Sequence, residues 1–314
     1  MNVPKQKIVL AGGAGLVGQN LAVRLWARGY RDILVLDKHR ANLDVLHRVQ
    51  PEIAAKYADL AEPGNWQRHF AGAGAVVMLQ AQIGGTDYGE FERNNLAATR
   101  HILDAVRTHG VPSLIHVSSS AVESAADDFY TRTKKAQEQM VRDSGLAGPI
   151  LRPTLMFGWF DRKHLGWLSR FMHRTPVFPV PGHGRYPRQP LYVGDFCNLL
   201  ISCIEGKVVT GTWNISGLEQ VDYIDIIREI RRVTGSRTPI VNIPYSLFAA
   251  LLRLWALFDR NPPFTAQQLA ALTAGDEFEV IDWPGIFGVP CTPFAEAIAE
   301  TFTHPVYGSV VLEF

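Results

Sequence analysis

The glycine-rich run near the N-terminus, KIVLAGGAGLVGQNLAVRL (residues 7–25), constrains the fold more than any other segment. An apolar stretch is followed by Gly12, Gly15 and Gly18 at three-residue intervals, and then by an amphipathic stretch. Glycines here let backbone N–H groups approach a ligand, and the start of a helix adds a dipole that favours an anion. The run therefore predicts a strand, a turn and a helix that bind a pyrophosphate, the alternative being a purely structural tight turn.

Short apolar runs alternate with amphipathic stretches through the first half of the chain. The apolar runs cover residues 7–12, 32–37, 75–80 and 113–119, and the amphipathic stretches cover residues 20–28, 43–49, 94–109 and 130–144. Strands that alternate with helices predict a parallel sheet built from right-handed crossovers. Uninterrupted apolar strands agree, because a parallel strand is buried on both faces. We expect an α/β protein with a Rossmann-type, doubly wound parallel sheet.

This rhythm changes after residue 158. Five prolines and two glycines between residues 176 and 190 describe a rigid, irregular connection. Beyond it, residues 193–205 and 222–233 suit helices around a strand at 211–216, and the last hundred residues look mainly helical. We expect a dinucleotide-binding domain over residues 1–154, to which residues 190–217 return, and a smaller, mainly helical substrate-binding lobe over residues 155–314.

The bulk composition excludes several classes of protein. The net charge of +1 gives no reason to expect nucleic acid, and the three cysteines and ten histidines show no metal-ligand spacing, so we expect no metal. The cysteine usage favours a reducing cytosol, hence a cytoplasmic protein. The apolar segment at residues 247–258 is too short to span a membrane. It predicts a helix buried in the second lobe, with docking on a membrane surface as the alternative.

Asp37 ends the second predicted strand, about twenty residues after the glycines, where a carboxylate can accept hydrogen bonds from adenosine ribose hydroxyls. A carboxylate there would repel a 2′-phosphate, so we expect NAD. The neighbouring Lys38, His39 and Arg40 leave NADP open. Asp59, at the end of the third strand, suits a position near the adenine, or else it caps a loop.

Tyr130 and Lys134 are four residues apart and share one face of a predicted helix. An ammonium beside the phenol would lower a pKa that is about 10 when unperturbed. The serine run at residues 118–120 ends a strand, so Ser119 or one of its neighbours Ser118 and Ser120 could hold a substrate oxygen. The alternative is an ordinary polar surface helix. Within a dinucleotide fold, the pattern predicts proton transfer in the interconversion of an alcohol and a ketone.

Together these motifs resemble the extended short-chain dehydrogenase/reductase family, especially its NAD-dependent epimerase/dehydratase branch, over nearly the whole chain. The motifs are Gly12-x-x-Gly15-x-x-Gly18, Asp37, Asp59-Leu60, MLQA (78–81), NNLAATRHILDAVRTHGV (94–111), VSSSAV (117–122), Tyr130-x-x-x-Lys134, LRPTLMFG (151–158), PLYVGDFCNLL (190–200) and GTWNISG (211–217). The resemblance implies that Tyr130 is the acid/base, that Lys134 binds the nicotinamide ribose, and that Ser119 supplies the hydroxyl.

The resemblance also implies a set of binding residues. For the cofactor they are Gly12, Gly15, Leu16, Val17, Gly18, Asp37, Asp59, Leu60, Gln80, Ala81, Tyr130, Lys134 and Pro153. For the substrate they are Ser120 and Arg188, the latter where relatives that act on sugar nucleotides place an arginine against the diphosphate.

The resemblance implies an NAD-dependent epimerase or ketoreductase that acts on a sugar nucleotide, at C4 of the sugar, and that pairs as a homodimer. Ser120 and Ala121 stand where the dehydratases carry an Asp-Glu pair, which disfavours dehydration. Two alternatives remain: a hydroxysteroid- or lipid-alcohol-type dehydrogenase, and a non-catalytic NAD(P)-binding subunit.

Overall fold

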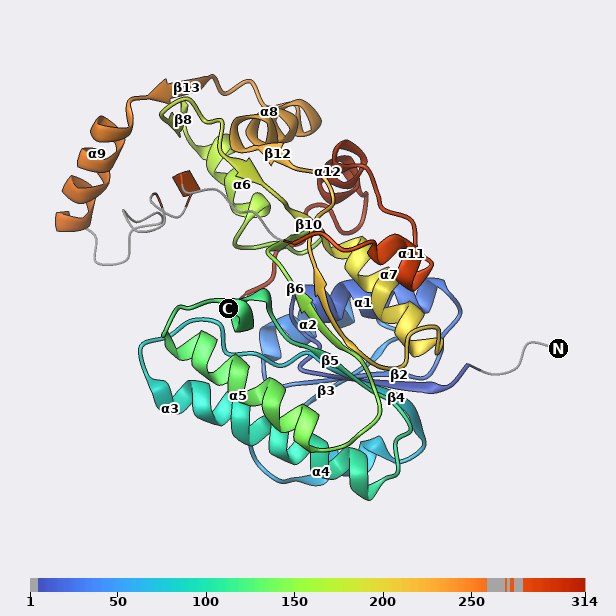
Figure 1. Cartoon of the computed structure of the whole chain (residues 1–314). Coiled ribbons are helices and arrows are strands. Elements are labelled where there is room, and N and C mark those ends of the chain that lie inside the picture. Colours follow the sequence, from blue (N-terminus) through green and yellow to red (C-terminus); the bar gives the residue numbers. More distant parts are fainter. Residues whose placement is uncertain (1–4, 259–268, 270–271, 274–278, 314) are drawn as a thin grey trace.

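The predicted parallel sheet is confirmed by the computed structural model, which describes residues 5–258, 269, 272–273 and 279–313. In these residues, seven strands pair in parallel in the order β11-β6-β5-β4-β1-β2-β3 (Figure 1). The strands are β1 (Lys7–Ala11), β2 (Ile33–Asp37), β3 (Ala54–Tyr57), β4 (Ala73–Met78), β5 (Leu114–Val117), β6 (Ile150–Pro153) and β11 (Thr212–Ile215).

Helices cover both faces of this sheet because its strands are apolar on both sides. In β1, Ile8 and Leu10 pack in one apolar cluster and Val9 and Ala11 pack in another, as expected when side chains alternate along a strand. The first cluster includes residues of α1 (Leu16–Ala27), α2 (Arg40–Val49) and α7 (Val193–Ile204), and the second includes residues of α4 (Ala98–Thr108). Other elements of this part are η1 (Asn65–Phe70), α3 (Tyr88–Phe91), the π-helix η2 (Glu92–Ala97), η3 (Ser120–Glu123) and α5 (Phe129–Asp143).

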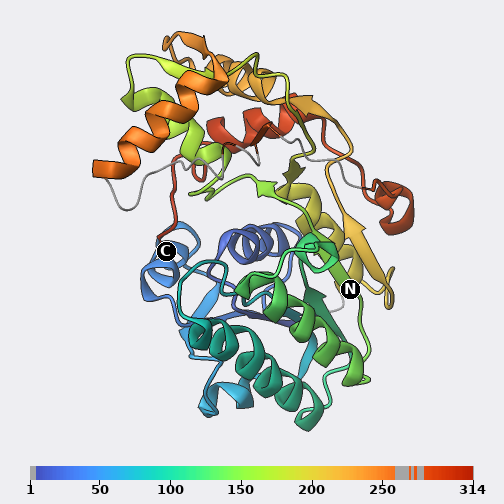
Figure 2. The same cartoon turned by 60° about the vertical axis from the view of Figure 1, so that its left-hand side comes forward.

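A second, smaller lobe lies above the sheet domain in the views of Figures 1 and 2. Within it, α8 contacts both α6 and α12, and short strands pair as β8 with β13, β9 with β12 and β7 with β10. Its elements are β7 (Met156–Phe157), α6 (Leu165–Arg174), β8 (Phe178–Pro181), β9 (Pro187–Arg188), β10 (Leu191–Tyr192), β12 (Val221–Asp222), α8 (Tyr223–Thr234), β13 (Ile240–Ile243), α9 (Tyr245–Phe258) and α12 (Phe294–Thr303). Helix α11 (Trp283–Phe287) instead packs beside α7 of the sheet domain (Figure 1).

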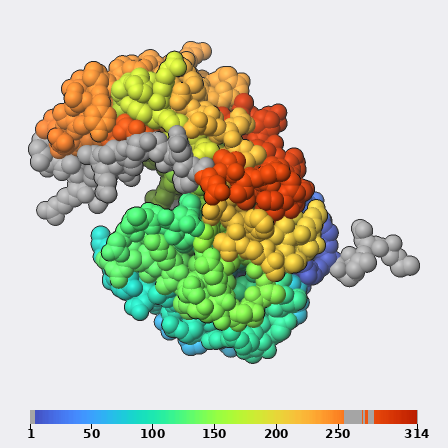
Figure 3. Space-filling view, in the orientation of Figure 1, coloured from blue at the N-terminus to red at the C-terminus, as the bar shows by residue number. Residues whose placement is uncertain are grey.

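The expectation that the apolar helix α9 is buried is wrong for the side chains that the structure describes. Leu247, Leu251 and Leu254 are 52%, 48% and 53% exposed. The helix lies at the outer end of the second lobe (Figure 3), and apolar residues occupy all its sides, so only one side, including Phe248 and Leu252, is partly covered. Among the described residues, no helix is long and apolar enough to cross a membrane.

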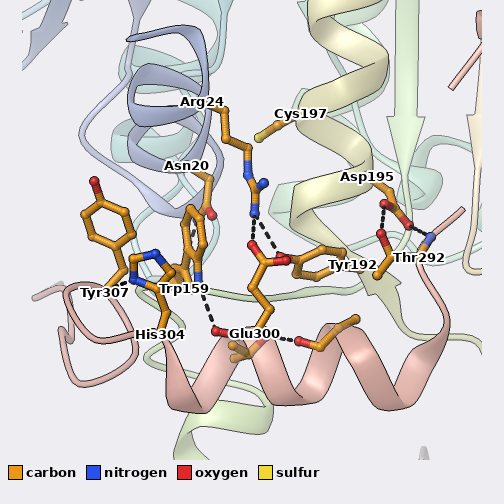
Figure 4. Close-up of polar contacts among 12 residues, drawn as sticks. Asn20, Arg24, Trp159, Tyr192, Asp195, Cys197, Thr292, Glu300, His304 and Tyr307 are labelled. Atoms are coloured by element: carbon orange, nitrogen blue, oxygen red, sulfur yellow. Dashed lines mark hydrogen bonds and ion pairs between the residues drawn. The ribbon is translucent and has the colours of Figure 1, made fainter. Parts of the chain in front are cut away.

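Arg24 of α1 joins the sheet domain to the second lobe (Figure 4). Its guanidinium donates to Glu300 Oε1 of α12 and to Tyr192 Oη, both at 2.8 Å. It also lies 4.2 Å from the centre of the Trp159 ring, in a cation–π contact. A single side chain on the helix that follows the glycine-rich turn therefore holds an ion pair, a hydrogen bond and an aromatic contact across the lobe junction.

The C-terminal segment runs back from the second lobe to the sheet domain. The side chain of Asn42 in α2 accepts from the backbone N–H of Glu313 and donates to its carbonyl oxygen, both at 2.7 Å. Leu312 is 1% exposed, in a cluster that includes Phe160. This segment adds a second connection between the two parts of the molecule.

We predict that Arg24→Met lowers the free energy of unfolding by about 1 to 3 kcal/mol, because it leaves Glu300 and Tyr192 without their common partner. Urea denaturation followed by circular dichroism measures the loss. Arg28→Met is the matched control, since Arg28 lies at the end of the same helix in an exposed hydrogen bond to Asn198. An equal loss in both variants would contradict a specific role for Arg24.

Candidate active site

The glycine-rich turn packs directly against the end of strand β4. Gly12 has φ +77°, and a Cβ atom on it would lie 2.5 Å from the backbone N and Cα of Gln80, too close for any side chain. A Cβ on Gly15 would meet nothing within 4 Å, because Gly15 borders a cavity of about 490 Å³. The turn therefore forms a wall whose backbone is open to a ligand.

The cavity contains nearly every residue that the sequence singled out. Its lining includes Gly12, Gly15, Leu16, Val17, Gly18, Asp37, Asp59, Leu60, Gln80, Ala81, Ser118, Ser119, Ser120, Tyr130, Lys134 and Pro153. These residues come from the carboxyl ends of six neighbouring strands and from the helices that follow them. This is where parallel α/β sheets bind ligands.

Asp37 organises the end of β2 beside the glycine-rich turn. Its Oδ2 accepts from the backbone N–H of Ala14 and its Oδ1 accepts from that of His39, both at 2.9 Å. Each carboxylate oxygen keeps further acceptor capacity, which suits the hydroxyls of a ribose.

The cations near Asp37 are engaged elsewhere. Lys38 Nζ donates to Asn94 Oδ1 at 2.5 Å, and the Arg40 guanidinium lies 3.9 Å from the centre of the Tyr57 ring. In these positions, neither of the two is held for a phosphate on the ribose, which agrees with NAD.

Asp59 forms part of the same wall after β3. Burial acts to raise its pKa, but hydrogen bonds from the Ala61 N–H and from Arg93 outweigh burial, and the pKa lies below its ordinary value. Arg93 Nη2 lies 2.7 Å from Asp59 Oδ2. The carboxylate both caps its loop and lines the cavity, so the two interpretations of Asp59 are compatible.

The hydroxyl groups of Ser118 and Ser119 lie in two different environments. Ser118 Oγ donates to Glu138 Oε2 at 2.6 Å, and Glu138, which is 2% exposed, also pairs with Arg152 Nη2 at 2.6 Å. Ser119 Oγ instead accepts from the backbone N–H of Ala121 at 3.2 Å, and Ser119 acts to lower the pKa of Tyr130. Ser118 therefore belongs to a buried ion-pair network, and Ser119 acts on the tyrosine.

The expected lowering of the pKa of Tyr130 is wrong in this structure. Burial raises its pKa, and this effect outweighs the hydrogen bond from Ser119, which acts to lower it. Lys134, whose ammonium donates to Val117 O at 3.2 Å and to Gln137 Oε1 at 2.5 Å, does not counteract the effect of burial on this pKa. The phenol is consequently protonated at neutral pH, ready to donate.

Lys134 itself is the most strongly perturbed basic group of the cavity wall. The side chain is 1% exposed, and burial lowers its pKa to about 7, although the nearby Glu138 acts to raise it. A change of pH through neutrality therefore changes the charge beside Tyr130.

Other cavity residues were not assigned to the site from the sequence. Thr154, Leu155 and Met156 follow β6, Gln82 and Ile83 follow β4, and all of them line the cavity. They are uncharged and have no distinctive spacing, so only the fold brings them here. His164 directly precedes α6 and also lines the cavity, and burial lowers its pKa.

Arg188 does not line the cavity in the described structure. It lies in β9, and its Nη2 donates to the carbonyl oxygen of Leu272 at 2.6 Å. Its predicted contact with the substrate stays a prediction.

The residues that line the cavity fit a dinucleotide. The open space at Gly15 and the carboxylate of Asp37 border one cavity, which Gln80 also lines. The buried Oε1 of Gln80 has no hydrogen-bond partner in the described structure. Within the described ranges, no group of three or more His, Cys, Asp or Glu residues could hold a metal ion.

This fold and this site define a dinucleotide-dependent oxidoreductase of the extended short-chain dehydrogenase/reductase type. The model of the NAD dependent epimerase/dehydratase family matches residues 8–216, and the chain belongs to this family. It is an NAD-dependent enzyme.

Known relatives include a reductase and enzymes named for nucleotide sugars. A 2-alkyl-3-oxoalkanoate reductase from Stenotrophomonas maltophilia is 29% identical over 84% of this chain and 89% of its own length. A dTDP-glucose 4,6-dehydratase from Neisseria meningitidis serogroup B is 27% identical over 72% of this chain and 75% of its own length. Among solved structures, a UDP-N-acetylglucosamine 4-epimerase from Methanobrevibacter ruminantium M1, in complex with UDP-N-acetylmuramic acid, superposes with a TM-score of 0.73 at 15% identity, over 95% of this chain and 97% of that one.

We predict that Lys134→Met changes how stability depends on pH. The pKa of Lys134 is about 7 in the folded protein and its ordinary value is 10.5, so between these values the unfolded chain binds more protons than the folded one. The stability of the wild type therefore rises with pH in this window, and the full cost of burying the ammonium applies below pH 7. The Lys134→Met variant has no ammonium to bury, so its stability lacks this dependence on pH.

The unfolding free energy of Lys134→Met minus that of the wild type should fall by a few kcal/mol between pH 7 and pH 10. Urea denaturation at several pH values measures it. The exposed neighbour Lys135, changed to Met, is the control and should show a nearly constant difference. A constant difference for Lys134→Met as well would contradict the lowered pKa.

Proposed function

We propose that the protein interconverts a secondary alcohol and a ketone, with NAD as the hydride carrier. The observation that carries this proposal is that Ser119, Tyr130 and Lys134 line the same cavity as the glycine-rich turn. A hydroxyl and a phenol can together hold one substrate oxygen while a proton moves to or from it.

The residues that would hold NAD follow from the lining of the cavity. The backbone of the glycine-rich turn and the start of α1 suit the pyrophosphate, Asp37 suits the adenosine ribose, and Lys134 suits the nicotinamide ribose. Bound NAD supplies a carbon that accepts hydride from an alcohol, or in its reduced form gives hydride to a ketone.

Tyr130 is the proposed general acid and base. In the direction of reduction, its phenol gives its proton to the carbonyl oxygen as that oxygen gains negative charge. The raised pKa of Tyr130 keeps the phenol protonated at neutral pH, which suits this direction. Ser119 Oγ holds the same oxygen by a hydrogen bond, and the resulting phenolate is stabilised by a protonated Lys134 nearby.

The proposed substrate is a nucleotide sugar, reduced or epimerised at C4. The family and the dTDP-glucose and UDP-sugar enzymes among its relatives support this class. Epimerisation would proceed through a ketone that receives hydride on its opposite face. Ser120 and Arg188 are the proposed contacts to the sugar and to the diphosphate, and the latter requires Arg188 to exchange the Leu272 carbonyl for phosphate oxygens.

A ketone with an alkyl chain is the second candidate. Ile83, Leu155 and Met156 contribute apolar residues to the lining of the cavity, and a 2-alkyl-3-oxoalkanoate reductase is among the relatives. Such a substrate would use the same Ser119 and Tyr130 but would not need Arg188.

We predict that Tyr130→Phe abolishes turnover and leaves the Kd for NAD within a few-fold of the wild type, because the ring remains and only the transferable proton is lost. Isothermal titration with NAD and an NADH absorbance assay give the two readouts. The adjacent Phe129→Leu is a packing control. Full activity in Tyr130→Phe would disprove the proposed mechanism.

Arg188→Ala separates the two substrate classes. If the arginine contacts a buried diphosphate, the variant binds UDP-glucose or dTDP-glucose more weakly by about 2 to 4 kcal/mol. Thermal shift in the presence of NAD, with each nucleotide sugar and with a 2-alkyl-3-oxo acid, shows which ligand raises the melting temperature of the wild type. Stabilisation by the oxo acid alone, with no effect of Arg188→Ala, would favour the second candidate.

A further inference from the structure

A buried chain of polar side chains runs behind the catalytic wall, from strand β4 to helix α5. Gln80 Nε2 donates to Thr99 Oγ1 at 3.1 Å, and Gln137 Nε2 donates to the same oxygen at 2.9 Å. Gln137 Oε1 accepts from Lys134 Nζ at 2.5 Å. Thr99 and Gln137 are both 0% exposed, so these bonds are shielded from water.

Thr99 fixes the direction of every bond in this chain. A hydroxyl has one proton to donate, and that of Thr99 is given to the carbonyl oxygen of Asn95 at 2.6 Å. Thr99 Oγ1 can therefore only accept from its other two partners. Each glutamine must turn its NH₂ group toward Thr99, so the amide oxygen of Gln137 is directed at Lys134 and that of Gln80 lies at the cavity wall.

These hydrogen bonds limit the orientations that the Lys134 ammonium can adopt. One N–H donates to Val117 O and one to Gln137 Oε1, which leaves a single N–H for the cavity that Lys134 lines. Rotation of the ammonium about the Cε–Nζ bond would break both buried bonds.

The other titratable groups around Lys134 do not replace this restraint. Glu138, one turn further along α5, acts on Lys134 through its charge but bonds to Ser118 and Arg152. His116 of β5 is fully buried with a pKa well below its ordinary value, so it is neutral. Tyr130 is protonated, because burial raises its pKa.

We infer that Gln137 is a positioning residue for the reaction: anchored by Thr99, its amide oxygen orients the Lys134 ammonium so that one N–H points into the cavity. The part of this inference that concerns turnover rests on the proposed function. The orientation itself is a property of the folded chain and can be measured without a substrate.

The direct test is the titration of Lys134 in the full-length protein labelled with ε-¹³C-lysine, followed by NMR between pH 5.5 and pH 10, with the resonance assigned from its loss in Lys134→Arg. Gln137→Glu places a carboxylate at the acceptor position and should raise the midpoint by about 1 to 3 pH units. Gln137→Leu removes the acceptor and should lower it. Thr99→Val frees the amide to turn its NH₂ toward Lys134, and should lower the midpoint by less than Gln137→Leu does.

The matched control is Gln139→Leu, an exposed glutamine on the same helix, which should leave the midpoint unchanged. Shifts of Gln137→Glu and Thr99→Val in opposite directions support the inference even where Gln137→Leu fails to fold. An unchanged midpoint in Gln137→Glu, or shifts of the same sign in both variants, overturns it.

The pH profile of kcat, measured on the substrate that stabilises the wild type, separates this inference from the proposed function. A profile that moves with the Lys134 midpoint supports both. If the NMR midpoint moves and the profile does not, Gln137 still orients Lys134, and the proposed stabilisation of the phenolate by Lys134 is wrong.

Discussion

The close approach of Gly12 to Gln80 is the contact on which the rest of the site depends. With a side chain at residue 12, the glycine-rich turn would have to move away from β4, because a Cβ atom would lie 2.5 Å from the Gln80 backbone. The approach brings the turn, the end of β4 and the start of α1 to one cavity. It also places the Gln80 amide against Thr99, where the buried chain that ends at Lys134 begins.

Buried polar groups, rather than exposed ones, give this site its chemistry. Ser118, Glu138 and Arg152 form an ion-pair network under the serine run, and this network removes Ser118 from the set of free hydroxyls. Ser119, one residue on, lines the cavity together with Tyr130 and acts to lower its pKa. Unpaired buried charges are costly, so each charged side chain at the base of the site is tied to a definite partner. Adjacent, chemically identical residues thereby acquire different roles.

The sequence predicts those features that depend on local pattern. Gly12, Asp37 and Tyr130 have a fixed spacing relative to strands or helices, so their common location could be inferred before the structure. The orientation of Lys134 could not, because it depends on Val117 and Gln137, and Gln137 is held by Thr99 from another helix. The exposure of α9 could not be predicted either. An apolar composition shows which residues a helix can bury, but it does not show which part of the fold lies beside the helix.

Arg24 links the position of the second lobe to the position of helix α1. It extends from the same helix whose first residues border the cavity, and it holds Glu300 and Tyr192 of the opposite side. A movement of the second lobe away from the sheet domain must either break these bonds or move α1 with it. The position of the second lobe and the position of the helix that borders the cavity are therefore linked through this guanidinium group, and the C-terminal segment likewise links the second lobe to α2.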